Sequence, residues 1–184
     1  MGYHRDKRFF NGGLINDPLE YQFRLNALIR NWLKFTKSNG LITWLAHGTV
    51  YGQIYNGMTF PWDNDFDVQM PISHLHLLSR YYNQSLIFED PREGNGRFFL
   101  DVGTSITSRI TGNGFNNIDA RFIDVDSGLY VDITGLSVSS HPLKDKFKDL
   151  YNENSPRIDL ASIMKDQVSP ERGEGLASMN ILEL

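Results

Sequence analysis

Residues 60–70 read FPWDNDFDVQM, in which apolar and acidic side chains alternate after an aromatic turn. Side chains in an extended strand point to opposite faces in turn. The alternation therefore predicts a strand within residues 63–70 that buries Phe66 and Val68. Asp65 and Asp67 would then lie side by side on the other face.

Two carboxylates held this close repel each other, and a bound cation relieves the repulsion. Mg²⁺ and Mn²⁺ prefer oxygen ligands and commonly take one or two carboxylates together with substrate phosphates. Residues 130–133 read YVDI and place Asp132 on a second predicted strand with apolar neighbours. We therefore expect Asp65, Asp67 and Asp132 to form a metal-dependent centre suited to phosphoryl transfer.

Two plainer interpretations apply to these acids. An Asp-x-Asp pair alone is common in solvated loops and turns. Asp63, Asp65 and Asp67 also have the first spacings of a calcium-binding EF-hand loop, which needs glycine at its sixth position and glutamate at its twelfth. Those positions hold Val68 and His74, which excludes the EF-hand.

Upstream, residues 47–52 read HGTVYG and follow a predicted short strand over residues 42–46. Such a turn from strand to helix can offer backbone N–H groups and a hydroxyl to a phosphate. We expect Gly48 and Thr49 to face a phosphate near the acids. The plainer interpretation is an ordinary turn that opens a helix ending near Tyr55.

The remaining pattern predicts an α+β domain with a mixed sheet. A long helix begins after the N-cap Asp17 with Pro18 in its first turn, and ends at Asn39-Gly40. A third helix, after the short one ending near Tyr55, is expected over residues 73–82. The other predicted strands cover residues 86–88, 97–102, 106–110, 118–125 and 129–133.

Length and composition narrow the class of protein. The 184 residues suggest one domain, which we place at residues 1–150, followed by a weakly packed tail at 151–184. The net charge of −4 argues against nucleic acid as a partner. The chain has no cysteine, so a cysteine nucleophile and cysteine-ligated zinc are excluded. We find no membrane segment and no targeting segment.

Taken together, HGTVYG at residues 47–52 and PWDNDFD at residues 61–67 resemble the signature of LicD-type phosphotransferases. That family includes the fukutin proteins and has the nucleotidyltransferase fold. Residues 118–124 (IDARFID), 127–136 (SGLYVDITGL) and 3–10 (YHRDKRFF) look closest to its fungal branch, which serves cell-wall mannan phosphorylation. The resemblance extends over residues 3–149.

The resemblance implies roles for individual residues. Asp65 and Asp67 would bind Mg²⁺ or Mn²⁺, with Asp132 completing the acidic set and Asp63 as a further ligand or a support. Gly48 and Thr49 would lie against the diphosphate of the donor. Arg121 would contact a phosphate or a sugar, unless it forms a structural ion pair with Asp119 or Asp124.

The reaction implied for the fungal branch takes mannose 1-phosphate from GDP-mannose to a hydroxyl of a glycan acceptor. Other members of the family use CDP-linked donors. In that reaction Asp132 would help to deprotonate the acceptor. The resemblance also implies the secretory pathway, in the lumen of the Golgi.

Two other functions stay open. One is a catalytically inactive regulator of mannosylphosphorylation that keeps the fold and binds nucleotide or metal, which the short C-terminus favours. The other is a metal-using glycosyltransferase with an Asp-x-Asp motif. Those enzymes place the motif after a nucleotide-binding half, whereas here it occurs by residue 65, after one clear helix.

Overall fold

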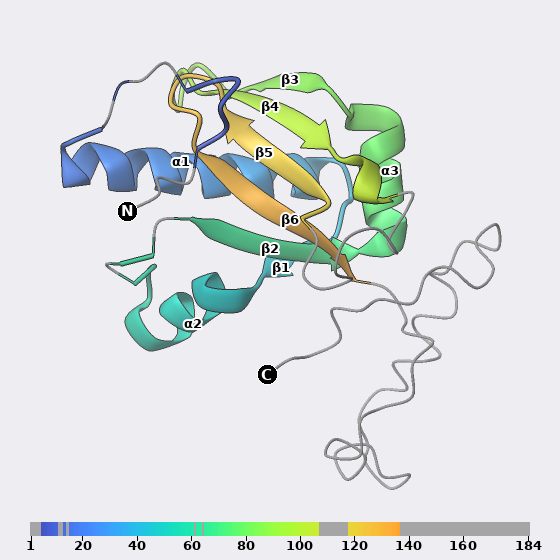
Figure 1. Ribbon diagram of the computed structural model, residues 1–184, viewed down its shortest axis with the longest axis horizontal. Coiled ribbons are helices and arrows are strands. Elements are labelled where there is room, and N and C mark those ends of the chain that lie inside the picture. Colours follow the sequence, from blue (N-terminus) through green and yellow to red (C-terminus); the bar gives the residue numbers. More distant parts are fainter. Residues whose placement is uncertain are drawn as a thin grey trace, which may run out of the picture.

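A computed structural model describes residues 5–10, 13, 15–60, 62–63, 65–106 and 118–136. It confirms the α+β class, with one six-stranded mixed sheet and flanking helices (Figure 1). The closer match to the nucleotidyltransferase fold stays a prediction. The domain limit at residue 150, the tail at 151–184 and most of the strand expected at 106–110 lie outside the described residues.

The elements follow the predicted order closely. They are α1 (Pro18–Ser38), β1 (Trp44–Leu45), α2 (His47–Asn56), β2 (Phe66–Pro71), α3 (Ile72–Tyr82), β3 (Ser85–Phe88), β4 (Arg97–Val102), a 3₁₀ turn (Thr104–Ile106), β5 (Ala120–Asp124) and β6 (Tyr130–Leu136). Among the described residues, no helix has both the length and the apolar character needed to cross a membrane.

Helix α1 has the ends that its sequence predicts. The Asp17 side chain accepts a hydrogen bond from the Leu19 N–H at 2.9 Å, which satisfies one of the free donors of the first turn. At the other end, Gly40 has φ 67°, a left-handed conformation that glycine adopts at little cost.

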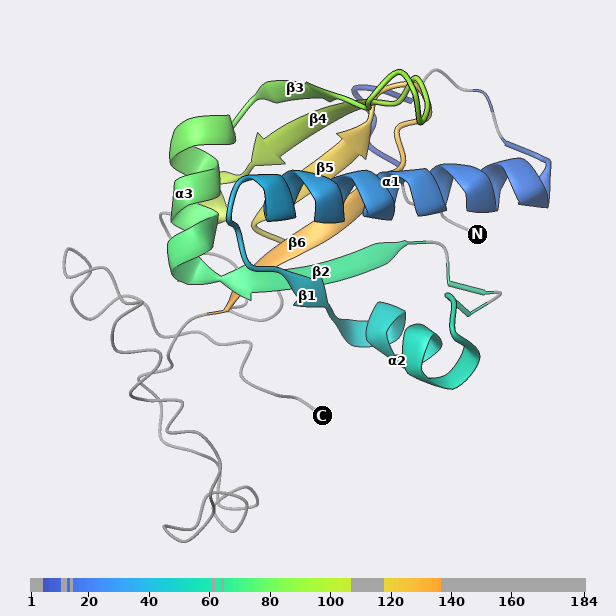
Figure 2. The same cartoon turned by 180° about the vertical axis from the view of Figure 1, so that it is seen from behind.

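The order of strands in the sheet is β1-β2-β6-β5-β4-β3. Strands β2 and β6 are parallel, and every other neighbouring pair of this sheet is antiparallel. The parallel pair lies side by side in both views (Figures 1 and 2). It joins segments that are distant in the sequence and places Asp67 opposite Asp132.

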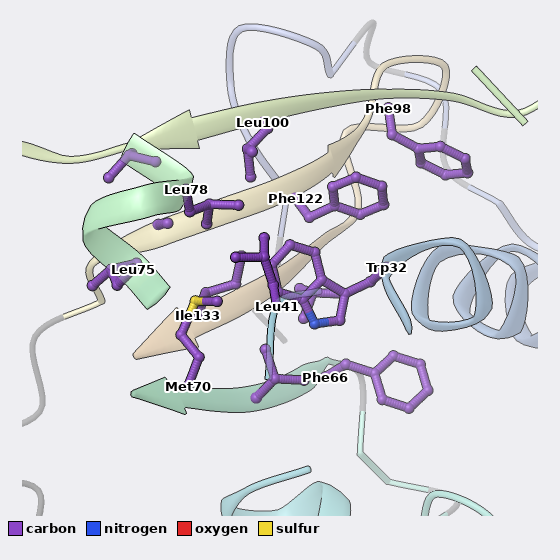
Figure 3. Close-up of a cluster of buried hydrophobic side chains, with 14 of the residues drawn as sticks. Trp32, Leu41, Phe66, Met70, Leu75, Leu78, Phe98, Leu100, Phe122 and Ile133 are labelled. Carbon is purple, nitrogen blue, oxygen red and sulfur yellow. The ribbon is translucent and has the colours of Figure 1, made fainter. Parts of the chain in front are cut away.

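The hydrophobic core lies between the sheet and helices α1 and α3, which pack on the same face (Figure 2). Trp32 of α1 is completely buried, with its ring centroid 5.5 Å from that of Phe122. Phe122 also stacks on Phe98 at 4.9 Å. Figure 3 shows these rings within the cluster. Apolar burial of this kind is the main stabilising contribution to such a fold.

The opposite face of the sheet is partly covered by residues 5–10. The Asp6 N–H donates to the Gly128 carbonyl at 2.7 Å, and the Phe9 ring lies 5.3 Å from Phe99. Arg8 bonds both Asp6 and Asp101. This N-terminal segment therefore packs beside β4 and the turn between β5 and β6.

Two strands differ from the sequence prediction. Strand β1 is only two residues long, whereas residues 42–46 were expected to form it. The Ile42 N–H donates to the side chain of His74 at Nδ1, and the Thr43 side-chain hydroxyl donates to the Gln69 carbonyl, so neither contact is a ladder bond between backbones. Around residue 106 the described chain forms a 3₁₀ turn, Thr104–Ile106, in place of the start of a strand.

Candidate metal centre

Three carboxylates meet where β2 and β6 run side by side. One ligand oxygen from each of Asp65, Asp67 and Asp132 lies within 4.8 Å of the others. Asp67 and Asp132 are register partners in the parallel pair, and Asp65 lies just before β2 begins. Their strand neighbours Phe66 and Val131 are buried in the core. The acids therefore lie on the sheet face turned away from α1.

Asp63 lies in the loop before β2, next to this cluster. Its Oδ2 is buried and has no hydrogen-bond partner among the described residues. Burial raises the pKa of Asp63 to about 6, and a hydrogen bond with Asp65 and the charges of Asp65 and Asp67 add to the effect. The structure thus places Asp63 in contact with Asp65, and its role as a further ligand or a support stays a prediction.

Gly48 and Thr49 contact the acidic segment directly. A Cβ added at Gly48 would lie 3.1 Å from Asp63 Oδ2, so glycine leaves room for that carboxylate. Thr49 is only 2% exposed, and its hydroxyl accepts a hydrogen bond from the Asp67 N–H at 2.9 Å. These contacts position the acids, and the role of the pair in holding phosphate stays a prediction.

Arg121 lies on β5, directly opposite Asp132 on β6. Its Nε donates to Asp132 Oδ1 at 3.1 Å. The sequence also allowed an ion pair of Arg121 with Asp119 or Asp124 as an alternative. That prediction is wrong about the partner, because Arg121 pairs with Asp132. Asp119 accepts from the Gly135 N–H at 2.7 Å, and Asp124 lies 3.5 Å from Arg24. The cross-strand register decides this pairing, and a single sequence does not reveal it.

Tyr130 is a residue of this site that the sequence did not single out. Its ring lies 4.3 Å from the guanidinium of Arg121, within the range of a cation–π contact. The pKa of Tyr130 is raised to about 12, mainly by burial and in part by the charge of Asp132. The sequence signal that could have identified Tyr130 is its position two residues before Asp132 on β6. Side chains two residues apart on a strand lie on the same face.

The residues present fit a hard divalent cation. All three ligand groups are carboxylates, the donors that Mg²⁺ and Mn²⁺ prefer. Asp65 and Asp67 are partly exposed while Asp132 is buried, so one side of the cluster stays open to water or to a ligand. Mg²⁺ typically completes its shell in that way.

Two curated proteins from Saccharomyces cerevisiae are similar to the whole chain. Mannosyltransferase regulator 4 is 58% identical over 195 aligned residues, and mannosyltransferase regulator 14 is 57% identical over 193. The chain covers 17% and 21% of their lengths, so it spans about a fifth of each. No protein-family model matches the chain.

These names correct one expectation. The resemblance to LicD-type phosphotransferases implied that the chain is an enzyme, and that interpretation is wrong. Both relatives, at 57–58% identity over the entire chain, are named as regulators of a mannosyltransferase and not as transferases. Membership of the LicD family itself stays a prediction.

Proposed function

We propose that this chain is a cation-binding regulatory domain that acts in mannosylation without transferring a sugar phosphate itself. The names of the two relatives support the regulatory role. The cluster of Asp65, Asp67 and Asp132 is the observation that carries the cation-binding part. The process we assign to it is mannosylphosphorylation of glycans, in the lumen of the secretory pathway.

The ligand that fits this proposal is a nucleotide sugar held through the metal. Mg²⁺ or Mn²⁺ on the three acids neutralises their charge and presents open positions to a diphosphate. GDP-mannose is the first choice, with CDP-linked sugars as the alternative. The conformation of the regulator would then respond to the concentration of the sugar donor, because a ligand shifts a protein toward the state that binds it more tightly.

Isothermal titration tests the cation and donor together. We expect the chain to bind Mn²⁺ and, in its presence, GDP-mannose, with no release of GMP when a mannan acceptor is added. The variant with Asp65→Asn and Asp67→Asn should lose both binding events. Asp90→Asn is the matched control, because the partly exposed carboxylate of Asp90 forms side-chain bonds with its neighbour Arg92.

Absence of Mn²⁺ binding by the unaltered chain would contradict the proposed metal site. Release of GMP would contradict the regulatory role. The role itself is tested by adding the chain to membrane extracts from yeast that lacks both relatives, and measuring transfer of mannose from GDP-mannose. The unaltered chain should change the rate, and the double variant should not.

A further inference from the structure

We propose that Arg121 is a built-in counter-cation of the acidic cluster, which occupies Asp132 in the metal-free protein and competes with the divalent cation for it. This inference rests on the metal centre described under the proposed function. It assigns Arg121 the task of setting metal affinity, in place of the contact with phosphate or sugar expected from the sequence.

The contact between Arg121 and Asp132 is a direct one. Arg121 Nε lies 3.1 Å from Asp132 Oδ1, and the carboxylate is buried, with 5% of its surface exposed. A buried carboxylate needs a charged or hydrogen-bonding partner, because its desolvation is costly. Arg121 supplies that partner to one of the three acids that hold the metal.

The cross-strand register explains why Arg121 turns to this acid. On one side of Arg121 its register partner is Asp101 of β4, and on the other it is Asp132 of β6. Asp101 already accepts a hydrogen bond from Arg8 Nη2 at 2.6 Å. The guanidinium of Arg121 is therefore directed to Asp132, whose next neighbour in the row is Asp67.

Tyr130 offers the guanidinium a second contact. Its ring centroid lies 4.3 Å from Arg121 Cζ, and a cation–π contact of this kind stabilises the charge independently of Asp132. Arg121 can thus release Asp132 to a metal and still keep a favourable position against the ring. Such an exchange breaks the hydrogen bond between Arg121 Nε and Asp132 Oδ1.

The competition has a defined direction. A fixed positive charge beside the centre repels an incoming divalent cation, and it also relieves the mutual repulsion of the acids while the metal is absent. Removing the charge should tighten metal binding and destabilise the metal-free fold. A residue that merely held Asp132 in place would have the opposite effect on affinity.

The test compares Arg121→Gln, which keeps a hydrogen-bond donor without the charge, with Arg121→Lys, which keeps the charge. We expect Arg121→Gln to bind Mn²⁺ roughly tenfold more tightly by isothermal titration, as removal of a nearby charge at intermediate dielectric implies. Its melting temperature should be lower without metal and rise further on adding Mn²⁺. Arg121→Lys should stay close to the unaltered chain.

Arg97→Gln is the matched control, because it removes an exposed cation that pairs with Asp126, away from the cluster. Its Mn²⁺ affinity should not change. If Arg121→Gln unfolds without metal, its refolding during a Mn²⁺ titration reports the affinity, and Arg121→Met provides a second neutral variant. Failure of both variants to refold with Mn²⁺ would count against the inference.

Equal or weaker Mn²⁺ binding by Arg121→Gln would overturn the counter-cation and leave Arg121 as a positioning residue. That result differs from failure of the proposed function, in which the unaltered chain itself does not bind Mn²⁺.

Discussion

At the scale of single residues, Thr49 positions a metal-binding carboxylate through the backbone. Its buried hydroxyl accepts a hydrogen bond from the Asp67 N–H near the start of β2. Because a buried donor without a partner is costly, this bond holds the chain where Asp67 enters the cluster. Thr49 acts on the site without belonging to the set of acids.

Thr49→Val should therefore affect both stability and metal binding. Valine has a similar shape but cannot accept the hydrogen bond, so we expect the free energy of unfolding to fall by about 1–3 kcal/mol. Mn²⁺ affinity should fall as Asp67 shifts. Chemical denaturation and isothermal titration measure the two effects. Thr49→Ser keeps the hydroxyl, and it should retain the metal affinity; equal losses in both variants would contradict the assigned role.

At the scale of the element, α2 positions the loop that precedes β2. The side of the helix that contacts this loop carries two glycines. Gly48 and Gly52 are four residues apart and so lie on the same side of the helix. Gly48 approaches Asp63, and Gly52 approaches the backbone of Met58, Thr59 and Phe60. This face lets the loop before β2 pack directly against the helix, which explains the spacing of the two glycines in HGTVYG.

Gly52→Ala should disturb this contact. The new Cβ would lie 2.9 Å from the Met58 carbonyl oxygen, a backbone atom that cannot move aside cheaply. We expect destabilisation of about 1–3 kcal/mol by overpacking, despite the better helix propensity of alanine. Thermal and denaturant unfolding measure it. Gln53→Ala, at an exposed neighbouring position, should be close to neutral; an equally neutral Gly52→Ala would mean that the loop adapts.

At the scale of the whole molecule, Glu89 connects helix α1 to the sheet through hydrogen bonds. Its carboxylate accepts from Arg30 Nη2 at 2.7 Å and Asn31 Nδ2 at 2.9 Å on α1, and from the Gly96 N–H at 3.0 Å beside β4. Burial alone would raise the pKa of Glu89, but these hydrogen bonds outweigh it and hold the pKa below its ordinary value.

The sign of the pH dependence follows from that lowered pKa. Glu89 stabilises the fold above the pKa of an unfolded glutamate, about 4.3, and the contribution is lost as the pH falls through the lower folded value. Glu89→Gln should therefore cost most near neutral pH, about 1–3 kcal/mol, and the difference from the unaltered chain should shrink toward pH 3. Urea unfolding across this range measures it.

Glu93→Gln is the control for this prediction, since it removes an exposed carboxylate paired with Lys34 on the same α1. Exposed pairs contribute less than about 1 kcal/mol, so the loss should be small. A gap between Glu89→Gln and the unaltered chain that stayed constant with pH would show that the carboxylate charge is not what joins the layers.

Much of the fold could be predicted from the sequence because helix ends and strand alternation are local properties. Asp17 and Asn39-Gly40 define the ends of α1 through hydrogen bonds to residues within the same or the nearest turn of the helix. The alternation in residues 66–70 assigned the buried and the less buried face correctly, since strand geometry allows only two faces. In residues 130–133 all four residues are buried, and Val131 and Ile133 are the two that belong to the core cluster. The shared face of Asp65 and Asp67 could be predicted by the same argument.

What the tertiary structure alone decided is which distant groups meet. The parallel register of β2 and β6 set Asp67 opposite Asp132, and the register of β5 and β6 gave Arg121 to Asp132 in place of Asp119 or Asp124. The contacts of Gly48 and Thr49 with the acidic segment also depend on how α2 packs. The pairing of β2 with β6 joins segments far apart in the chain. In either strand pair, a one-residue change in register would turn the side chains to the other face.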